Sequence, residues 1–183
     1  AVHPWVEIGG ENSLKYGAGA LVDGSVYWPF YGEGRIIRIN TATMDISFVD
    51  LPSQIKVYGH NFKAGETKDG QLCIVYASDD FLLRAWTRSL DADGIEVWVL
   101  KNILSLSEGI DEITEGCAVD LPVDLKVVQV RSGYVYLSAT CMTHPGTLRC
   151  WFISLSLETT EFELLVHGCF GGSVCPYNMA WPP

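Results

Sequence analysis

The sequence lacks the features of a membrane-spanning or nucleic-acid-binding chain. No apolar run approaches the roughly twenty residues that a bilayer-spanning helix needs, and no signal-peptide pattern is visible. Basic residues are few and scattered, with 12 Lys and Arg against 22 Asp and Glu, so the net charge is −10 over 183 residues. Nucleic acids and anionic membranes are polyanions that need clustered Lys and Arg. We therefore predict that the protein binds neither.

Motifs of catalysis are missing as well. The sequence has no G-x-S-x-G nucleophile elbow and no glycine-rich phosphate loop with its lysine. Its cysteines and histidines stand in no recognisable catalytic context, and no spacing marks a pair of carboxylates for hydrolysis. The sequence therefore predicts no enzyme and no cofactor. Because carboxylates are plentiful, a propeller glycosidase or a carbohydrate-binding protein stays open as the alternative.

Closely spaced zinc ligands are also absent. Cys141, His144 and Cys150 are too far apart for the usual zinc-binding pattern, so this segment is interpreted as a hairpin loop and no metal is predicted. The six cysteines do not define a unique disulfide pairing. A chain of this length can build a core without disulfides, and it contains no N-glycosylation acceptor. We favour an intracellular protein with reduced thiols over a disulfide framework.

What is present is a recurring pattern of short strands. Alternation of apolar and polar residues near the start of the chain predicts strands at 19–30, 35–40 and 46–51. The first of these is broken by Asp23-Gly24, a pair suited to a tight turn because Gly accepts a positive φ without steric cost. The segment predicts an antiparallel meander.

The meander returns twice. Each copy opens on a turn glycine followed by an apolar strand, and these glycines are Gly24, Gly70 and Gly133. They are 46 and 63 positions apart, so the second copy is followed by an insertion, placed at 105–124. Within one domain of residues 1–183, the predicted repeats cover 17–56, 62–104 and 125–167.

A repeat of this kind predicts a β-propeller. Units of roughly 40 to 50 residues made of short strands are typical of propeller blades, as in the WD and kelch arrays. One small sheet cannot bury both of its faces alone, so neighbouring sheets stack on it. We expect an all-β fold of antiparallel meander repeats, with about three blades visible. Propellers close with typically four to eight blades, so we expect a larger propeller that a missing segment or a second chain completes.

The insertion is the first candidate contact with a protein partner. It carries six acidic residues and no basic one, and Asp111, Glu112 and Glu115 would form a patch for a basic partner. Charge runs of this kind are more often solvated than functional. The other interpretation of the insertion is therefore a solvated surface excursion with one short helical turn.

Aromatic residues provide the second set of candidates. Most of them, including Trp86 and Trp151, fall inside predicted strands, where packing between blades explains them. Four others are surrounded by turn signals, and an aromatic anchor in an exposed loop marks a protein-binding site. These candidate anchors are Trp5, Tyr31, Tyr58 and Phe170.

Three segments carry a family resemblance. They are the Asp23-Gly24 turn before the strand containing Tyr27-Trp28, the strand IEVWVLK at 95–101, and the segment PYNMAWPP at 176–183. With these segments the chain resembles the plant F-box-associated domains and the related grass family of domains of unknown function, of the 1618 type. The resemblance covers most of the chain and implies a kelch-like β-propeller that recognises other proteins.

The resemblance also implies a role. In F-box members, an N-terminal helical F-box docks on a Skp-type adaptor while the propeller captures the protein to be ubiquitinated. No amphipathic helical segment precedes the repeats in this sequence, so no F-box is expected within it. We expect a protein-protein interaction module of the cytoplasm or nucleus. It would be the substrate-recognition region of an F-box type ubiquitin-ligase receptor, or a free-standing relative.

Overall fold

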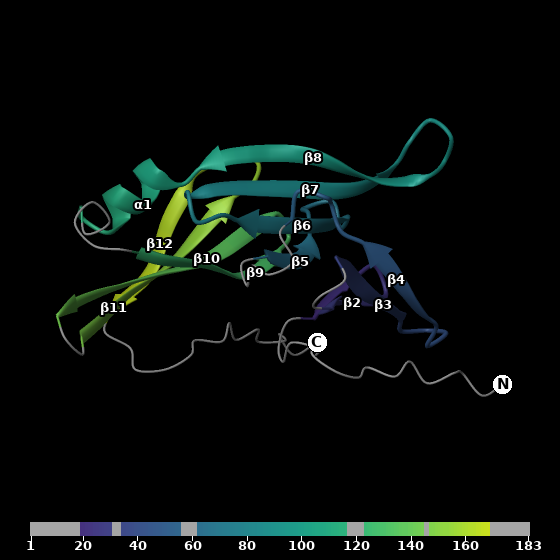
Figure 1. Ribbon diagram of the computed structural model, residues 1–183, viewed down its shortest axis with the longest axis horizontal. Coiled ribbons are helices and arrows are strands. Elements are labelled where there is room, and N and C mark those ends of the chain that lie inside the picture. The colour runs from purple at the N-terminus through teal and green to yellow at the C-terminus, as the bar shows by residue number, and fades with distance from the viewer. Residues whose placement is uncertain (1–18, 31–33, 56–61, 117–122, 145–146, 169–183) are drawn as a thin grey trace, which may run out of the picture.

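The computed structural model describes residues 19–30, 34–55, 62–116, 123–144 and 147–168. These residues form three four-stranded antiparallel sheets and one short helix (Figure 1). In every sheet the strands are hydrogen-bonded in chain order. The expectation of an all-β fold built from antiparallel meanders is confirmed, with the helix as the addition.

The first sheet follows the predicted strands closely. Its strands are β1 (Ala20–Val22), β2 (Ser25–Phe30), β3 (Arg35–Asn40) and β4 (Ile46–Asp50). The break at Asp23-Gly24 is a tight turn in which both residues have positive φ, 43° and 66°. The corresponding turn glycines of the other sheets, Gly70 and Gly133, have φ of 75° and 80°, so the glycine that marks each repeat serves the same turn.

The second sheet lies between the other two. Its strands are β5 (Phe62–Glu66), β6 (Leu72–Ala77), β7 (Leu82–Leu90) and β8 (Glu96–Ser105). Alternate side chains of β6 enter two different cores: Ile74 packs with the first sheet, whereas Cys73 and Val75 pack with the third sheet. All three side chains are fully buried. A central sheet buried on both faces explains why β6 is an unbroken apolar run rather than an alternating one.

The third sheet follows the helix. Its strands are β9 (Val123–Arg131), β10 (Tyr134–His144), β11 (Thr147–Ser156) and β12 (Phe162–Gly168). The register of β9 on β10 shifts between Tyr136 and Leu137, which marks a bulge. The core side chains of this sheet, among them Val135 and Leu137, face the second sheet.

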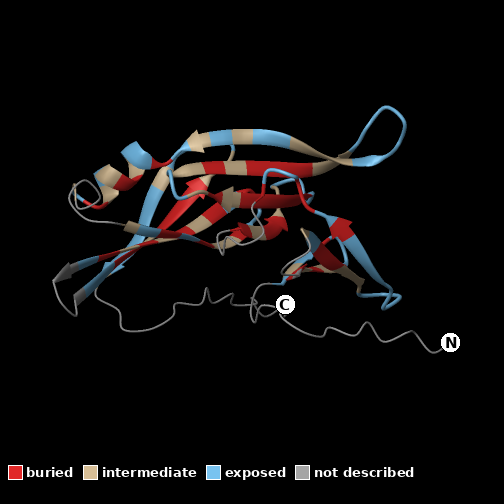
Figure 2. Ribbon diagram, in the orientation of Figure 1, coloured by how far each residue is buried: buried red, intermediate tan, exposed pale blue. Residues whose placement is uncertain are grey.

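The sheets meet along their first strands. β5 contacts β9 on one side and β1 on the other, and β6 also contacts β9. The last strands β4 and β12 are mostly exposed, and β8 is exposed or intermediate, whereas β5 and β6 are largely buried (Figure 2). Strands that run in order from a shared interior to an exposed rim are the arrangement of propeller blades.

One glycine shows how closely the inner strands approach. A Cβ on Gly65 of β5 would overlap the carbonyl oxygen of Val130 on β9 and lie 2.6 Å from the Val130 Cβ. Only a residue without a side chain fits there, and glycine inside a strand commonly marks such a close backbone approach.

Two inner strands had not been predicted in full. The second repeat was predicted to open at its turn glycine, but β5 precedes that turn from Phe62 onward. The third repeat was predicted to open at its turn glycine, but β9 precedes that turn from Val123 onward. β5 has no exposed residue, so it lacks the exposed face that produces a clear alternation, whereas β9 alternates from Val123 to Val127 before its bulge interrupts the pattern.

The insertion is folded rather than fully solvated. Helix α1 (Ser107–Ile113) lies between β8 and β9, and the short helical turn of the second interpretation is present. Leu106 and Ile110, however, are fully buried in the core shared by the second and third sheets. A solvated excursion would leave them exposed, so that part of the interpretation is wrong.

Candidate binding surface

The two ends of the sheets differ in what connects their strands. At one end, called here the turn end, lie the tight connections β1–β2, β3–β4, β5–β6, β7–β8, β9–β10 and β11–β12. The opposite end carries α1 and is called the helix end (Figure 1). Loops at one end of a rigid scaffold are where binding residues concentrate.

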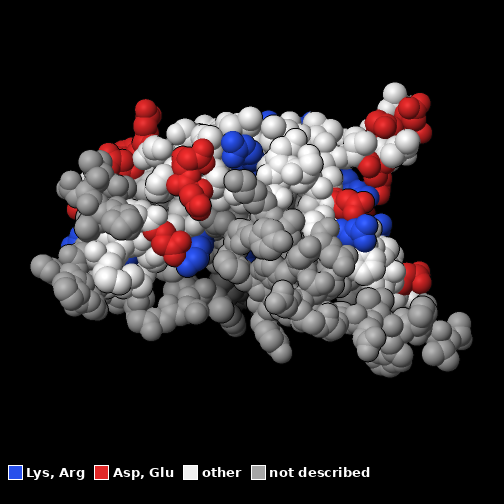
Figure 3. All heavy atoms as spheres, viewed as in Figure 1, with Lys and Arg blue, Asp and Glu red and all other residues white. Residues whose placement is uncertain are grey.

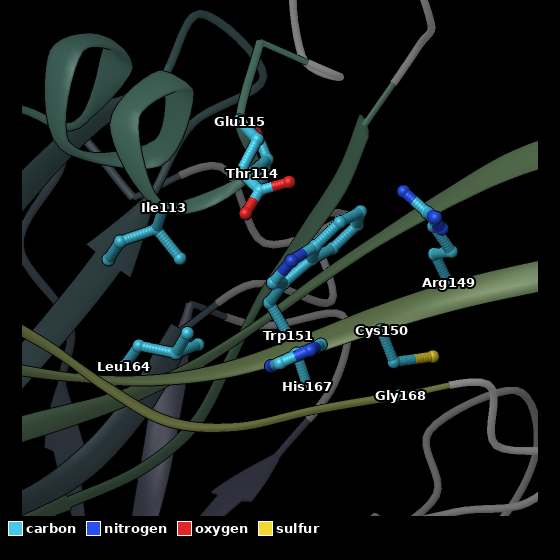
Figure 4. A pocket seen from close by; sticks show the side chains of 9 residues that line it. All are labelled: Ile113, Thr114, Glu115, Arg149, Cys150, Trp151, Leu164, His167 and Gly168. Carbon is cyan, nitrogen blue, oxygen red and sulfur yellow. The ribbon is translucent and has the colours of Figure 1, made fainter.

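A cavity lies at the helix end, beside the C-terminal end of α1. It has a volume of about 240 Å³ (Figure 4). Its lining comes from α1 and the residues that follow it, from the start of β11 and from β12: Ile113, Thr114, Glu115, Arg149, Cys150, Trp151, Leu164, His167 and Gly168. Because the third sheet and the helix both contribute, the cavity exists only when the insertion is docked.

Helix α1 is docked by packing and by one backbone hydrogen bond. The Leu106 N–H donates to the Phe81 carbonyl oxygen over 2.8 Å, which ties the start of the helix to the β6–β7 turn. Ile110 is inserted into the core. A Cβ on Gly109 would lie 2.8 Å from the ring of Phe162 on β12, so the helix backbone lies directly against that ring. These contacts fix the wall of the cavity.

The floor and rim of the cavity differ in chemistry. Trp151 lies across its middle, with Thr114 and Glu115 above it and His167 below (Figure 4). Trp151 and His167 are direct cross-strand partners on β11 and β12. Leu164 and Ile113 extend the apolar part, whereas Glu115, Arg149 and His167 provide groups that can carry charge.

The cavity is small for a metabolite. Small-molecule sites occupy about 300–1,000 Å³, and this cavity has about 240 Å³. An apolar floor with a polar rim is also the composition of a pocket that takes one anchoring side chain of a protein partner. The arrangement can therefore hold a single large side chain.

A second, smaller hollow lies at the same end. It has about 200 Å³ and is lined by residues of the β6–β7 turn and the start of β9, among them Ser78, Asp79 and Asp124. The neighbouring Asp80 carboxylate accepts a hydrogen bond from the Ser78 hydroxyl. This bond lowers the pKa of Asp80 from its ordinary value.

The structure separates the three acidic candidates. Glu115 is exposed, has a φ of +53° and lines the cavity. Glu112 is exposed but does not line it. Asp111 is half-buried, and its Oδ1 is a buried atom without a hydrogen-bond partner among the described residues. The three residues therefore do not form one uniform exposed patch.

The four aromatic candidates Trp5, Tyr31, Tyr58 and Phe170 lie outside the described residues. They stay predictions. Arg149, Trp151 and His167 are not among the binding residues predicted from the sequence, and Trp151 was assigned to packing between blades. The alternation within β11 does place Arg149 and Trp151 on one face. Their proximity to α1, however, follows only from the tertiary arrangement.

No group of three or more His, Cys, Asp and Glu side chains in the described part of the chain could hold a metal ion. Among the described segments, no helix is long and apolar enough to span a membrane.

Comparison with known proteins identifies the family. A family model described as "F-box protein AT5G49610-like, beta-propeller" matches residues 11–183. No curated protein matches the chain at a significant level. The family match covers nearly all of the sequence and confirms the resemblance to plant F-box-associated propellers. The chain therefore belongs to the F-box protein AT5G49610-like β-propeller family.

Proposed function

We propose that this protein is a protein-interaction module that holds its partner at the helix end, with one side chain of the partner in the cavity beside α1. The observation that carries the proposal is the cavity itself, an apolar floor around Trp151 with a rim that includes Glu115 and Arg149. Membership of an F-box propeller family supports a protein rather than a metabolite as the ligand.

We also infer a more specific role. The protein would be the substrate-recognition region of an F-box type ubiquitin-ligase receptor, kelch-like in its blades, or a free-standing relative, and its partner would be a ubiquitination target. The name of the matching family supports this role. The free thiols of Cys73 and Cys150 suit a reducing compartment, so the proposed location is the cytoplasm or nucleus.

A larger propeller forms part of the proposal. An apolar row crosses all four strands of the first sheet in register, formed by Leu21, Val26, Ile39 and Ile46. Leu21 and Ile46 are 65% and 55% exposed, although the opposite face of the sheet is buried against the second sheet. A further blade, supplied by a missing segment or a second chain, would cover this row as blades cover one another elsewhere in the fold.

The partner-binding proposal is tested by filling the cavity. Leu164 lines it and is 39% exposed, so Leu164→Trp places an indole in the cavity without disturbing the buried core. Ile103→Trp on β8 is the matched control, because Ile103 is 58% exposed and lies outside the cavity. Each form is used for affinity purification from plant extract, followed by mass spectrometry.

We expect the wild-type protein and Ile103→Trp to capture the same specific proteins, and Leu164→Trp to lose them. Equal capture by all three forms, or no specific capture by the wild-type protein, would contradict the proposal. A captured protein should also accumulate in plant cells depleted of this protein if it is a ubiquitination target. Unchanged abundance would remove the ligase role and leave the binding role intact.

The proposal treats the protein as a binding module without enzymatic activity. Several of its carboxylates serve turns: Asp91 Oδ1, for example, accepts hydrogen bonds from the N–H groups of Asp93 and Ile95. A glycan array and a panel of glycosidase substrates should both be negative. Turnover of any substrate would favour the alternative of a propeller glycosidase, and glycan binding alone would favour a carbohydrate-binding protein.

A further inference from the structure

A wide groove lies at the turn end, between the first and second sheets. It has a volume of about 600 Å³, within the range of about 300–1,000 Å³ typical of ligand sites. Its lining comes from β1, β2, β3, β5, β6 and β7, from the β1–β2 and β5–β6 turns and from the start of β8. The groove is therefore separate from the cavity beside α1, which lies at the opposite end of the sheets.

The basic groups of the groove are already engaged. The guanidinium of Arg88 forms an ion pair with Glu96, with 2.6 Å between nitrogen and oxygen, and lies 5.9 Å from the ring centroid of Trp98. Arg38 Nε donates a hydrogen bond to the Ser25 hydroxyl over 3.2 Å. Acidic and basic side chains accordingly stand side by side on the surface beneath the β7–β8 hairpin (Figure 3).

Acidic groups are in excess. The lining contains four carboxylates and two guanidinium groups. Asp23, Glu66 and Asp69 form no ion pair among the described residues, although Glu66 accepts a hydrogen bond from the Ser132 hydroxyl over 3.1 Å. Like negative charges held at one concave surface make the local potential negative, and a cation that enters the groove lowers their electrostatic repulsion.

The floor of the groove is apolar. Val22, Tyr27 and Leu72 line it and are at most 7% exposed. The long stems of Lys and Arg bury their methylene groups on such surfaces while the charged end reaches polar groups. Apolar floor and acidic wall together match the two halves of a basic side chain.

We propose that the groove between the first and second sheets binds a basic side chain, Arg or Lys, of a protein partner. Residues from two sheets build the site, so it depends on the stacking of the blades and not on any one turn. It does not rest on the function proposed for the helix end: either surface can fail its test while the other passes.

The test uses two fluorescein-labelled peptides of equal length, Gly-Arg-Arg-Arg-Gly and Gly-Glu-Glu-Glu-Gly, and follows binding by fluorescence anisotropy. We expect the arginine peptide to bind at low salt and to weaken as NaCl is raised, because the attraction is electrostatic. The glutamate peptide should not bind.

Two matched double variants locate the binding. Asp23→Asn with Asp69→Asn removes two charges from the groove, and Asn tolerates the positive φ at position 23. Asp45→Asn with Glu108→Gln removes two exposed charges outside it. The groove variant should bind the arginine peptide about tenfold more weakly than the wild-type protein, and the control variant should stay within about twofold.

An equal loss in both double variants would overturn the proposal, because it would show a general attraction to an acidic protein. Unchanged binding in the groove variant would overturn it as well, as would failure of the wild-type protein to bind the arginine peptide. Denaturation midpoints of the variants, measured first, separate a lost site from a lost fold.

Discussion

The turn end and the helix end hold neighbouring sheets together in different ways. At the turn end the contact is between backbones: the Gly133 N–H donates to the Glu66 carbonyl oxygen over 3.0 Å, and Gly65 lies directly on Val130. At the helix end the contact is made by side chains of α1, chiefly Ile110 and Leu106, against the core. Backbone contacts restrict which residues are allowed, whereas side-chain packing tolerates replacement by residues of similar volume. At the helix end, a packed position such as Ile110 therefore accepts residues of similar volume, whereas Gly65 at the turn end accepts no side chain.

The largest change in the free energy of unfolding is expected from Ile110→Ala at the helix end. The side chain is fully buried, so its truncation should lower the free energy of unfolding by about 4 kcal/mol. The control Glu108→Ala, on the exposed side of α1, should cost less than about 0.5 kcal/mol. Chemical denaturation measures both. Equal effects would mean that α1 is not docked through Ile110.

Gly65→Ala tests the turn end. The added Cβ overlaps the backbone of Val130, so β5 and β9 must separate, at a cost of about 3 kcal/mol. Gly70→Ala is the control, because its Cβ would meet no atom within 4 Å and only its φ of +75° is unfavourable. That control should cost about 1 kcal/mol, measured by the same denaturation experiment. If Gly65→Ala were no more harmful than Gly70→Ala, the inner strands would not be in close backbone contact.

Two of the described cysteines, Cys73 and Cys150, offer a comparison of reactivity between the ends. Cys73, near the turn end, is fully buried, and burial, followed by the charge of Glu66, raises its pKa to about 12. Cys150, near the helix end, keeps 5% exposure. Because the thiolate is the reactive form, iodoacetamide at pH 8 should modify Cys150 at least about tenfold faster than Cys73. Peptide mass spectrometry measures the two rates, and in denaturant they should become equal.

The buried thiol of Cys73 also predicts how the stability of the protein changes at alkaline pH. The ordinary pKa of cysteine, 9.0, is raised in the folded protein to about 12, so the folded state holds the Cys73 proton more tightly than the unfolded state does. The contribution of Cys73 to stability is complete below pH 9 and is lost as the pH rises toward 12. The denaturation midpoint of the wild-type protein should fall over this interval. The fall should be smaller in Cys73→Ala, which lacks the thiol.

The smallest effect is expected from Lys68→Met at the turn end. Lys68 Nζ and Glu158 Oε2 are 2.9 Å apart, but their side chains are 68% and 55% exposed. Hydrogen bonding to Glu158 raises the pKa of Lys68, yet exposed pairs are screened by water and salt. The denaturation midpoint should not change measurably. A clear loss would show that side chains as well as backbones hold the turn end together.

Prediction from the sequence succeeded where the signal is local. Alternation predicted the strands of the first sheet, and the positive φ of Gly24, Gly70 and Gly133 agrees with the turns that those glycines predicted. It missed most of β5 and β9. Gly65 resembles a strand breaker, but it is required by the approach of Val130 from another sheet. For α1, the acidic residues of its exposed face indicated a solvated segment, although Leu106 and Ile110 anchor the helix in the core.

The candidate site was predictable only in part. Glu115 was found from the acidity of the insertion, whereas Trp151 and His167 were not, because aromatic and histidine residues in strands are more often packing residues. Their pairing depends on the register of β11 and β12. The aromatic candidates outside the described residues stay open to test.

The sequence by itself determined the meander, because turns and strand alternation depend on residues within a few positions of one another. Only the tertiary structure decided where the cavity and the groove lie. Ile113, Trp151 and His167 are far apart along the chain, as are Asp23, Glu66 and Arg88. Stacking of separate sheets brings each set together. Stacking is driven by burial of apolar area, which is not directional and does not specify in the local sequence which residues become neighbours.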